Sequence, residues 1–480
     1  MIKGELVMKK IKYLFVASAA LMVLGGCSED LMDTINHERN DATDMTAVNM
    51  LPAVEMQTAV QTAGTDLAWY ASVYVEHNAG TWGQHSTADK RVAQNDASIF
   101  GNNWNSTYDI LNTLKVIQTK CDVGGPEEGN NKVLGMSQVL TAYNLGVLTD
   151  LFGDVPFTES LQGVANMRPK FDKQQDLYPL IQSYLDKAIV NLGKSGKNPS
   201  GKDYFYGGNV GQWIKAAWAL KARYYLRLSN VDVNAATNAL TCIANAFSGN
   251  DDNFIFAKYD ETAIGENPWY QFLNDRTHLS VSKNLFDVMT ARNDPRIAVY
   301  FDVVEVSEDV FDYVPAPNGT AEQNQGGVYS VSLMSEDVSA PTPIMSFHEL
   351  KFIEAEAKFR TGAADWKTSL QEAIAASFAY HGSNADAAAY FTAEVDPRLT
   401  AGNEIKEIIT QKWIALYEAE AIEAYNDYRR TGFPAMTNPN NLTATGGFVN
   451  RYPYGLSEVT ANGANVPKID VFKDKVWWAK

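Results

Sequence analysis

The sequence predicts a mainly α-helical protein with one long irregular segment. Apolar residues recur at steps of three and four through much of residues 50–291, 346–380 and 404–434, which is the spacing of helices with one buried face. Between Phe301 and Pro343 this spacing fails, and Val, Tyr, Pro, Asn and Gly predict long loops with a few short strands. The helical segments also come in pairs of roughly 35 to 45 residues, so neighbouring pairs can share a continuous core.

The predicted helices follow one another along the chain. In the first half they cover residues 50–75, 99–121, 132–151, 174–192, 210–228, 233–246 and 279–291. In the second half they cover residues 346–362, 366–380 and about 25 residues from Glu404 onward. Such helix pairs predict tetratricopeptide-like hairpins, which bury their apolar faces by stacking on one another.

The last of these helices carries the clearest signal of burial. Arg429 and Arg430 suit its carboxyl end, and Gly432 and Pro434 stop it. Its apolar residues fall on a single face, and these are Ile405, Ile408, Ile409, Trp413, Leu416 and Tyr417. We therefore predict one continuous helix that packs inside the protein.

Glutamates accompany the apolar faces of two predicted helices. Packed helices use such carboxylates most often to pair with arginines of a neighbouring helix, and a catalytic carboxylate pair is the weaker interpretation. The residues concerned are Glu349, Glu354, Glu356, Glu418, Glu420 and Glu423. We expect them to join helix to helix through ion pairs.

The amino terminus has the order of an export signal. Lysines precede an apolar run over residues 13–24, which is shorter than the about 20 residues of a membrane-spanning helix. The run ends in the letters LGGC, which resemble a bacterial lipobox whose cysteine is Cys27. We predict a signal peptide over residues 1–26, a lipidated flexible leader over residues 27–44, and a single domain over residues 45–480.

The charge balance argues against nucleic acid as a partner. The whole chain has 40 basic and 57 acidic residues, a net charge of -17. Removal of residues 1–26 takes away four lysines and one glutamate, which leaves a net charge of -20. Binding to phosphate backbones requires clustered Lys and Arg, and the sequence has no such cluster.

Neither the cysteines nor the histidines indicate a metal site, and we expect no metal and no cofactor. Six histidines show no HxxxH or HxH spacing, so zinc chemistry has no support. Asp150 and Asp154 lack the Asp, Asn and Gly pattern of a calcium loop. Cys121 and Cys242 lie far apart in the sequence, and free, buried thiols are favoured over a disulfide.

Several motifs in one order resemble the SusD/RagB family of surface nutrient-binding lipoproteins. After LGGC come FGDVPFTE at residues 152–159, NDPR at residues 293–296 and SFHELKFIEAEAKFRTG at residues 346–362. QKWIALYEAEAIEAYNDYRRTGFP then occupies residues 411–434, and RYPY opens a tail that runs to Trp478. The likeness spans nearly the whole chain, and it is greatest to the subgroup with the RRTGFP and RYPY elements.

This resemblance implies a fold and a function. The fold is one in which about four tetratricopeptide-like units back an irregular, ligand-facing region near residues 301–343. The implied function is that of an outer-membrane lipoprotein, exposed on the cell surface, that captures a nutrient, usually a glycan. The implied partner is a SusC-like TonB-dependent transporter. The family shares no residue-level motif in its ligand loops, so the resemblance itself assigns no site residue.

Aromatic side chains in loops are the best candidates for glycan contacts, because sugars stack their C–H faces on aromatic rings and bond their hydroxyls to polar neighbours. Tryptophans at helical spacing, such as Trp104, Trp213, Trp218, Trp366 and Trp413, are instead expected in the core. The candidate ligand-binding residues are Trp82, Gln84, His85, Trp269, Tyr270, Arg276, Tyr313, Asn318 and Tyr329.

Two other functions stay open at the level of the sequence. The first is a binder of peptide or another non-glycan nutrient, because the loops are only weakly aromatic and the surface is acidic. The second is a surface glycoside hydrolase, which would need two carboxylates about 5 to 9.5 Å apart across a cleft. We expect a protein that is not an enzyme and has no catalytic residues, since no nucleophile or metal constellation stands out.

Overall fold

The computed structural model describes residues 45–262, 265–442 and 446–480. The predicted signal peptide, Cys27 and the leader to residue 44 lie outside these residues. Residues Ala47–Lys480 form one unit by their internal contacts. The prediction of a mainly α-helical protein is confirmed, and the short strands of the described part fall between the helical segments.

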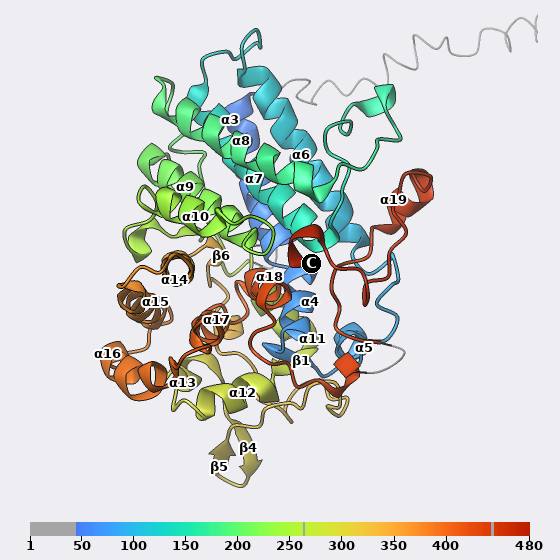
Figure 1. Cartoon of the computed structure of the whole chain (residues 1–480). Coiled ribbons are helices and arrows are strands. Elements are labelled where there is room, and N and C mark those ends of the chain that lie inside the picture. The colour runs from blue at the N-terminus through green and yellow to red at the C-terminus, as the bar shows by residue number, and fades with distance from the viewer. Residues whose placement is uncertain (1–44, 263–264, 443–445) are drawn as a thin grey trace, which may run out of the picture. The chain divides into compact units, whose positions relative to one another are not determined.

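Helices of the first half pack side by side in the order of the sequence (Figure 1). Helix α6 packs on α7, α7 on α8, α8 on α9 and α9 on α10, as expected for stacked helix pairs. Their bounds are α3 (Ala47–Gln57), a π-helix (Thr58–Ala63), α4 (Asp66–Tyr74), α5 (Gly83–Asp89), α6 (Gly101–Cys121), α7 (Asn131–Phe152), α8 (Gln174–Gly193), α9 (Val210–Arg227) and α10 (Ala235–Ile243).

The central helix of this array is α7, whose residues from Val133 to Phe152 are all buried. A helix whose side chains are apolar or hydrogen-bonded on every side is expected in the middle of a core. Gly146 allows the close approach of α9, because a Cβ atom placed there would lie 2.1 Å from the Tyr224 hydroxyl oxygen. Any larger residue at position 146 would therefore push the two helices apart.

Helices of the second half continue the array. Helix α14 packs on α10, α15 and α17, and so joins the two halves. The bounds are α11 (Pro268–Arg276), α12 (Lys283–Thr290), α13 (Ile297–Tyr300), α14 (Phe347–Thr361), α15 (Trp366–Tyr380), α16 (Ala387–Tyr390), α17 (Glu404–Ala415), α18 (Ala421–Thr431) and α19 (Leu456–Ala461). None of the helices in the described part is both long enough and apolar enough to span a lipid bilayer.

Within the described residues, three small antiparallel sheets connect the irregular segments. The first pairs β1 (Asn78–Gly80) with β3 (Leu279–Val281), so that Ala79 lies opposite Ser280. The second pairs β2 (Phe254–Phe256) with β6 (Thr342–Met345), and the third pairs β4 (Val304–Ser307) with β5 (Val310–Asp312). Figure 1 shows the β4–β5 hairpin at the end of the unit away from α6, α7 and α8.

The continuous helix predicted from Glu404 is wrong, because α17 ends at Ala415 and α18 starts at Ala421. Glu418, in the break, adopts a positive φ of 56° and is buried. Its carboxylate accepts hydrogen bonds from Asn78 Nδ2 at 3.1 Å and from Ser335 Oγ at 2.7 Å. Apolar residues keep their helical spacing on both sides of the break, so the periodicity gives no sign of it.

Two other predicted helices are also interrupted. Residues 50–75 form α3, a π-helix and α4, with a turn at Gly64 and Thr65. Residues 279–291 begin as strand β3, and the hydroxyl of Ser282 then caps α12 by accepting hydrogen bonds from two backbone N–H groups. In the second case the pairing of β3 with β1 outweighs the short-range periodicity.

The expected ion pairs between helices are present. Arg430 of α18 donates hydrogen bonds to Glu356 of α14 from both of its terminal nitrogens, and Nη2 lies 2.7 Å from Glu356 Oε2. The same Nη2 also donates to Asp427 Oδ1 at 2.8 Å. Arg223 of α9 binds Glu349, and Arg227 binds Glu423. Three glutamates differ from this pattern. Glu354 pairs with lysines of its own helix, Lys351 and Lys358. Glu418 accepts the hydrogen bonds described above, and Glu420 accepts hydrogen bonds from the backbone N–H of Ser346 at 3.1 Å and from its hydroxyl at 2.8 Å.

The expected core residues are largely where periodicity placed them. Trp104, Trp213 and Trp413 are buried, whereas Trp218 and Trp366 are half-buried. Cys121 and Cys242 are both free and buried, as expected.

Breaking the pair between α14 and α18 is expected to cost much stability. Arg430→Met removes the cation that Glu356 and Asp427 share and leaves these buried carboxylates with only Arg360 and Lys412, respectively, which costs about 3 kcal/mol of unfolding free energy. Urea unfolding measures this change. The control is Lys283→Met, because Lys283 and Asp287 form an ion pair with about half of each side chain exposed, and its loss costs less than about 0.5 kcal/mol. Equal effects of the two substitutions would contradict the assigned role of Arg430.

Asp89, the last residue of α5, joins three segments of the chain. Its carboxylate accepts hydrogen bonds from the Gly319 backbone N–H at 2.7 Å and from Asn438 Nδ2 at 2.9 Å. Burial raises the pKa of Asp89 from 3.8 to about 7, although Arg91 lies near enough to oppose the shift. Between those values the unfolded chain releases a proton that the folded protein retains, so this group lowers stability as the pH rises.

Replacement of Asp89 is therefore expected to change the pH dependence of stability. Relative to the wild type, the unfolding free energy of Asp89→Asn should rise by about 1.4 kcal/mol per pH unit between about pH 4 and pH 7. The slope is the relevant readout, because the amide also alters the hydrogen bonds at every pH. Urea unfolding across this pH range measures it, and parallel profiles for variant and wild type would refute the raised pKa.

Candidate ligand-binding cleft

Asn267 fixes the start of α11 and with it the position of two aromatic residues. Its Oδ1 accepts hydrogen bonds from the backbone N–H groups of Trp269 at 2.8 Å and Tyr270 at 3.2 Å, the usual role of an N-cap asparagine. Its Nδ2 donates to the Ala340 carbonyl oxygen at 2.8 Å, and its backbone N–H donates to Val338 O at 2.9 Å. The helix start is thus tied to residues 338–340, and Trp269 and Tyr270 line different cavities.

The larger cavity is an open cleft of about 760 Å³. One wall is α11 with its following turn, and the facing walls are residues 302–305 and 326–331. The Asp302 backbone N–H donates to Val331 O at 3.0 Å and so joins the two facing walls. We call this cavity the open cleft. Its lining includes two tyrosines, Tyr270 and Tyr329, and polar side chains, among them Asn274, Thr277, Asp302 and Glu305.

The chemistry of the open cleft suits a ligand rich in hydroxyl groups. Tyr270 and Tyr329 are half-buried and offer ring surface together with a phenolic hydroxyl. Asn274 and Thr277 offer both donors and acceptors, and the carboxylates accept hydrogen bonds from hydroxyls. The Tyr329 ring packs on buried alanines of neighbouring loops, and its hydroxyl accepts a hydrogen bond from the Glu322 backbone N–H at 3.2 Å, which holds the ring in place.

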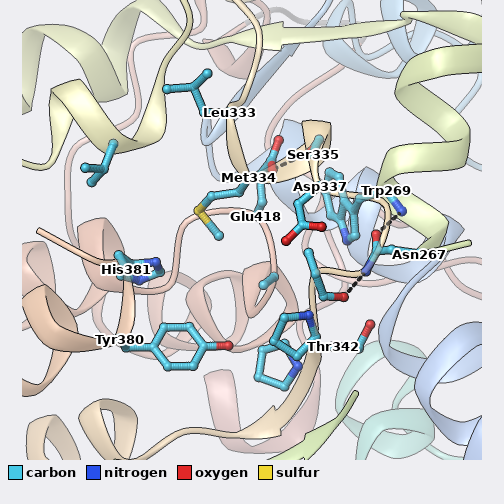
Figure 2. A pocket seen from close by; sticks show the side chains of 15 residues that line it. Asn267, Trp269, Leu333, Met334, Ser335, Asp337, Thr342, Tyr380, His381 and Glu418 are labelled. Carbon is cyan, nitrogen blue, oxygen red and sulfur yellow. Dashed lines mark hydrogen bonds between the residues drawn. The ribbon is translucent and has the colours of Figure 1, made fainter. Parts of the chain in front are cut away.

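The smaller cavity, about 300 Å³, lies on the other side of Trp269 and is shown in Figure 2. We call it the inner pocket; its lining includes Trp269, Leu333, Met334, Pro341, Tyr380 and His381. Glu418, from the break between α17 and α18, also lines it. Ser335 lines both cavities and donates to Glu418, so the two cavities are neighbours.

Burial sets the charges at the inner pocket. It raises the pKa of Glu418 above its usual range, although the hydrogen bonds from Ser335 and Asn78 oppose the shift. Burial also holds the pKa of His381 well below 6.5, so this imidazole is neutral. Nε2 of His381 lies 3.0 Å from the Ala415 carbonyl oxygen, which only accepts, so Nε2 carries the proton and Nδ1 is an acceptor.

The structure brings three of the nine candidate residues to these cavities. Tyr270 and Tyr329 line the open cleft, and Trp269 lines the inner pocket with its ring edge against Trp69. Trp82 and Gln84 are exposed at the start of α5 and line neither cavity. The Thr81 carbonyl oxygen accepts from the Asn324 backbone N–H at 2.9 Å, so Trp82 lies beside the loop that leads to Tyr329.

The other four candidates line neither cavity. His85 is fully buried against Tyr70 and Phe272, and burial lowers its pKa to about 3, so no ligand reaches it in this structure. Asn318 is buried, and its Oδ1 accepts from Ser282 Oγ at 2.6 Å. The remaining two are Tyr313, which packs on Phe286, and Arg276, which is exposed at the end of α11.

Sequence reasoning missed most of the polar residues of both cavities. Asn274, Asp302 and Glu305 carry no pattern that separates them from ordinary surface residues. Tyr380 ends a predicted helix, and the candidate residues were sought among loop aromatics. Within the part of the chain that is described, no three His, Cys, Asp or Glu side chains come together as a metal site would require.

Comparison with known proteins identifies the family. Residues 39–455 match the model of a SusD-like family described as "Starch-binding associating with outer membrane". A search of curated proteins gives no match. A SusD/RagB family protein from Bacteroides thetaiotaomicron is 33% identical with a TM-score of 0.83, covering 91% of this chain and 99% of its own.

Two more distant structures share the fold alone. A chitin-binding SusD homolog from Flavobacterium johnsoniae is 22% identical with a TM-score of 0.74, over 89% of this chain and 98% of its own. A SusD homolog from Bacteroides uniformis is 21% identical with the same TM-score, over 91% of this chain and 100% of its own. Since the family model covers residues 39–455, with motifs in the expected order, the chain belongs to the SusD-like family of outer-membrane-associated proteins.

Proposed function

We propose that this protein is a non-enzymatic glycan-binding lipoprotein of the cell surface and that the open cleft is its binding site. The observation that carries the proposal is the pairing of Tyr270 and Tyr329 with amide, hydroxyl and carboxylate groups in one cavity of about 760 Å³. A sugar ring can lie on an aromatic face while its hydroxyl groups bond to the polar residues around it.

The binding step fits a carrier that must release its ligand. A few aromatic contacts and hydrogen bonds at a solvent-open site give modest affinity, in the micromolar to millimolar range, about -8 to -4 kcal/mol. Lipid on Cys27 and the leader over residues 27–44 would hold the domain, residues 45–480, at the outer membrane. Delivery would follow by closure onto a SusC-like TonB-dependent transporter, which is the partner that family membership favours.

Substitution of the two cleft tyrosines is expected to weaken glycan binding. Tyr270→Ala and Tyr329→Ala should each lower affinity about tenfold, because each removes a stacking surface and a hydroxyl. Affinity electrophoresis and calorimetry on residues 28–480, with plant, host and microbial glycans, measure this loss. The control is Tyr204→Ala, because Tyr204 has a comparable partly exposed ring that lines neither cavity.

The substitution Trp82→Ala tests whether the glycan-binding site is the open cleft or instead lies at the start of α5. Trp82 is 37% exposed and lines neither cavity, so its loss should leave affinity unchanged. A loss with Trp82→Ala but none with Tyr270→Ala or Tyr329→Ala would move the site to the start of α5. A panel in which peptides bind and glycans do not would favour the peptide carrier, for which the carboxylates of Asp302, Glu305 and Glu336 at the open cleft could bind cationic side chains.

A further inference from the structure

The inner pocket differs in character from the open cleft. Leu333, Met334 and Pro341 give it apolar walls, and the rings of Trp269 and Tyr380 add aromatic surface. Figure 2 shows the Tyr380 hydroxyl directed toward the space between these side chains. Polar side chains, among them Ser335, Asp337 and Thr342, share this lining, so the pocket suits a small group that combines an apolar part with a polar part.

Two hydrogen-bond donors of the inner pocket are unused. Among the residues that the structure describes, the Tyr380 hydroxyl and the Trp269 indole N–H donate to no protein atom. A ligand that brings an acceptor oxygen to these two groups therefore gains hydrogen bonds that the protein itself does not form. A carbonyl oxygen beside a short apolar group satisfies both the donors and the apolar walls.

Acceptors are also present at the inner pocket. Nδ1 of the neutral His381 can accept a hydrogen bond, because Nε2 already donates to the Ala415 carbonyl oxygen. Glu418 contributes its carboxyl group, which is already engaged by Asn78 and Ser335. The set of donors, acceptors and apolar walls therefore fits an acetyl group, whether it is attached as an amide or as an ester.

We propose that the inner pocket binds an acetyl substituent of a glycan whose sugar rings lie in the open cleft. The two cavities share Ser335, and the consecutive residues Trp269 and Tyr270 line one each, so a single ligand can occupy both. The ligand class is then an acetylated oligosaccharide. This inference rests on the proposed function, which it narrows from glycans in general to those that carry N-acetyl or O-acetyl groups.

The test compares probes that differ in the acetyl group. Cellohexaose and chitohexaose share a β-1,4 backbone and lack charge, but only the second carries acetamido groups. Acetylated xylo-oligosaccharides and the same sample after alkaline deacetylation provide the ester pair. We expect calorimetry on residues 28–480 to give at least fivefold tighter binding of the acetylated member of one pair, and which pair responds distinguishes amide from ester.

Variants then test whether the inner pocket causes the tighter binding of the acetylated probe. Tyr380→Phe keeps the ring and removes one donor, so it should lower affinity for the acetylated probe about fivefold and leave the unacetylated probe unchanged. Tyr270→Ala should lower the affinity for both probes by the same factor, because it acts on the sugar ring. Thermal unfolding verifies that each variant is folded. Equal binding within both pairs, or no change in the acetyl preference with Tyr380→Phe, would overturn the inference and leave the open cleft as a glycan site.

A second measurement works even where no oligosaccharide binds. Saturation-transfer NMR with N-acetylglucosamine at millimolar concentration reports which ligand protons approach the protein. We expect the acetyl methyl protons to receive more saturation than the ring protons in the wild type. In Tyr380→Phe we expect the methyl and ring protons to receive similar saturation. A methyl signal no stronger than the ring-proton signals refutes the acetyl pocket, whereas silence of the oligosaccharide panel with a methyl signal refutes only the proposed glycan carrier.

Discussion

The buried ion pairs between α9, α14 and α18 are the constraint on which the rest of the structure depends. Arg223 and Arg227 of α9 reach carboxylates of α14 and α18, and Arg430 of α18 returns to α14. Buried charges are tolerated only when each one is paired, so the three helices have one low-energy arrangement relative to one another. Because α14 packs on both halves of the helical array, this arrangement also fixes the second half on the first.

The site depends on that framework through the break between α17 and α18. The ion pairs hold α18 in place, and the break then projects Glu418 toward Asn78 and Ser335. Ser335 belongs to the segment that lines both the open cleft and the inner pocket. A rigid helical layer therefore positions loops that are otherwise irregular, which is the common way in which folds carry binding sites.

Both local and distant contacts position the residues that line the two cavities. Asn267 and Pro268 start α11 by local chemistry that is visible in the sequence, since an asparagine cap followed by proline is typical of a helix start. The same asparagine then bonds to residues 338–340, more than 70 positions away. This second contact ties the start of α11 to the segment that lines the inner pocket, and from there Trp269 lines the inner pocket and Tyr270 lines the open cleft.

The sequence by itself determined the helical class, most helix bounds, the family and the pairing of Glu349, Glu356 and Glu423 with arginines of another helix. The helical class and the helix bounds rest on periodicity and capping residues, which act over a few neighbouring residues, whereas the family rests on the resemblance of motifs along the chain. Only the tertiary structure decided which partner each charge takes, where the helix at residues 416–420 breaks, and which loop aromatics share a cavity. His85 and Asn318 were expected in ligand-facing loops but are buried, and Tyr380, at the end of a predicted helix, lines the inner pocket. Burial and cavity shape arise from contacts between distant segments, and such contacts leave no periodic trace in the sequence.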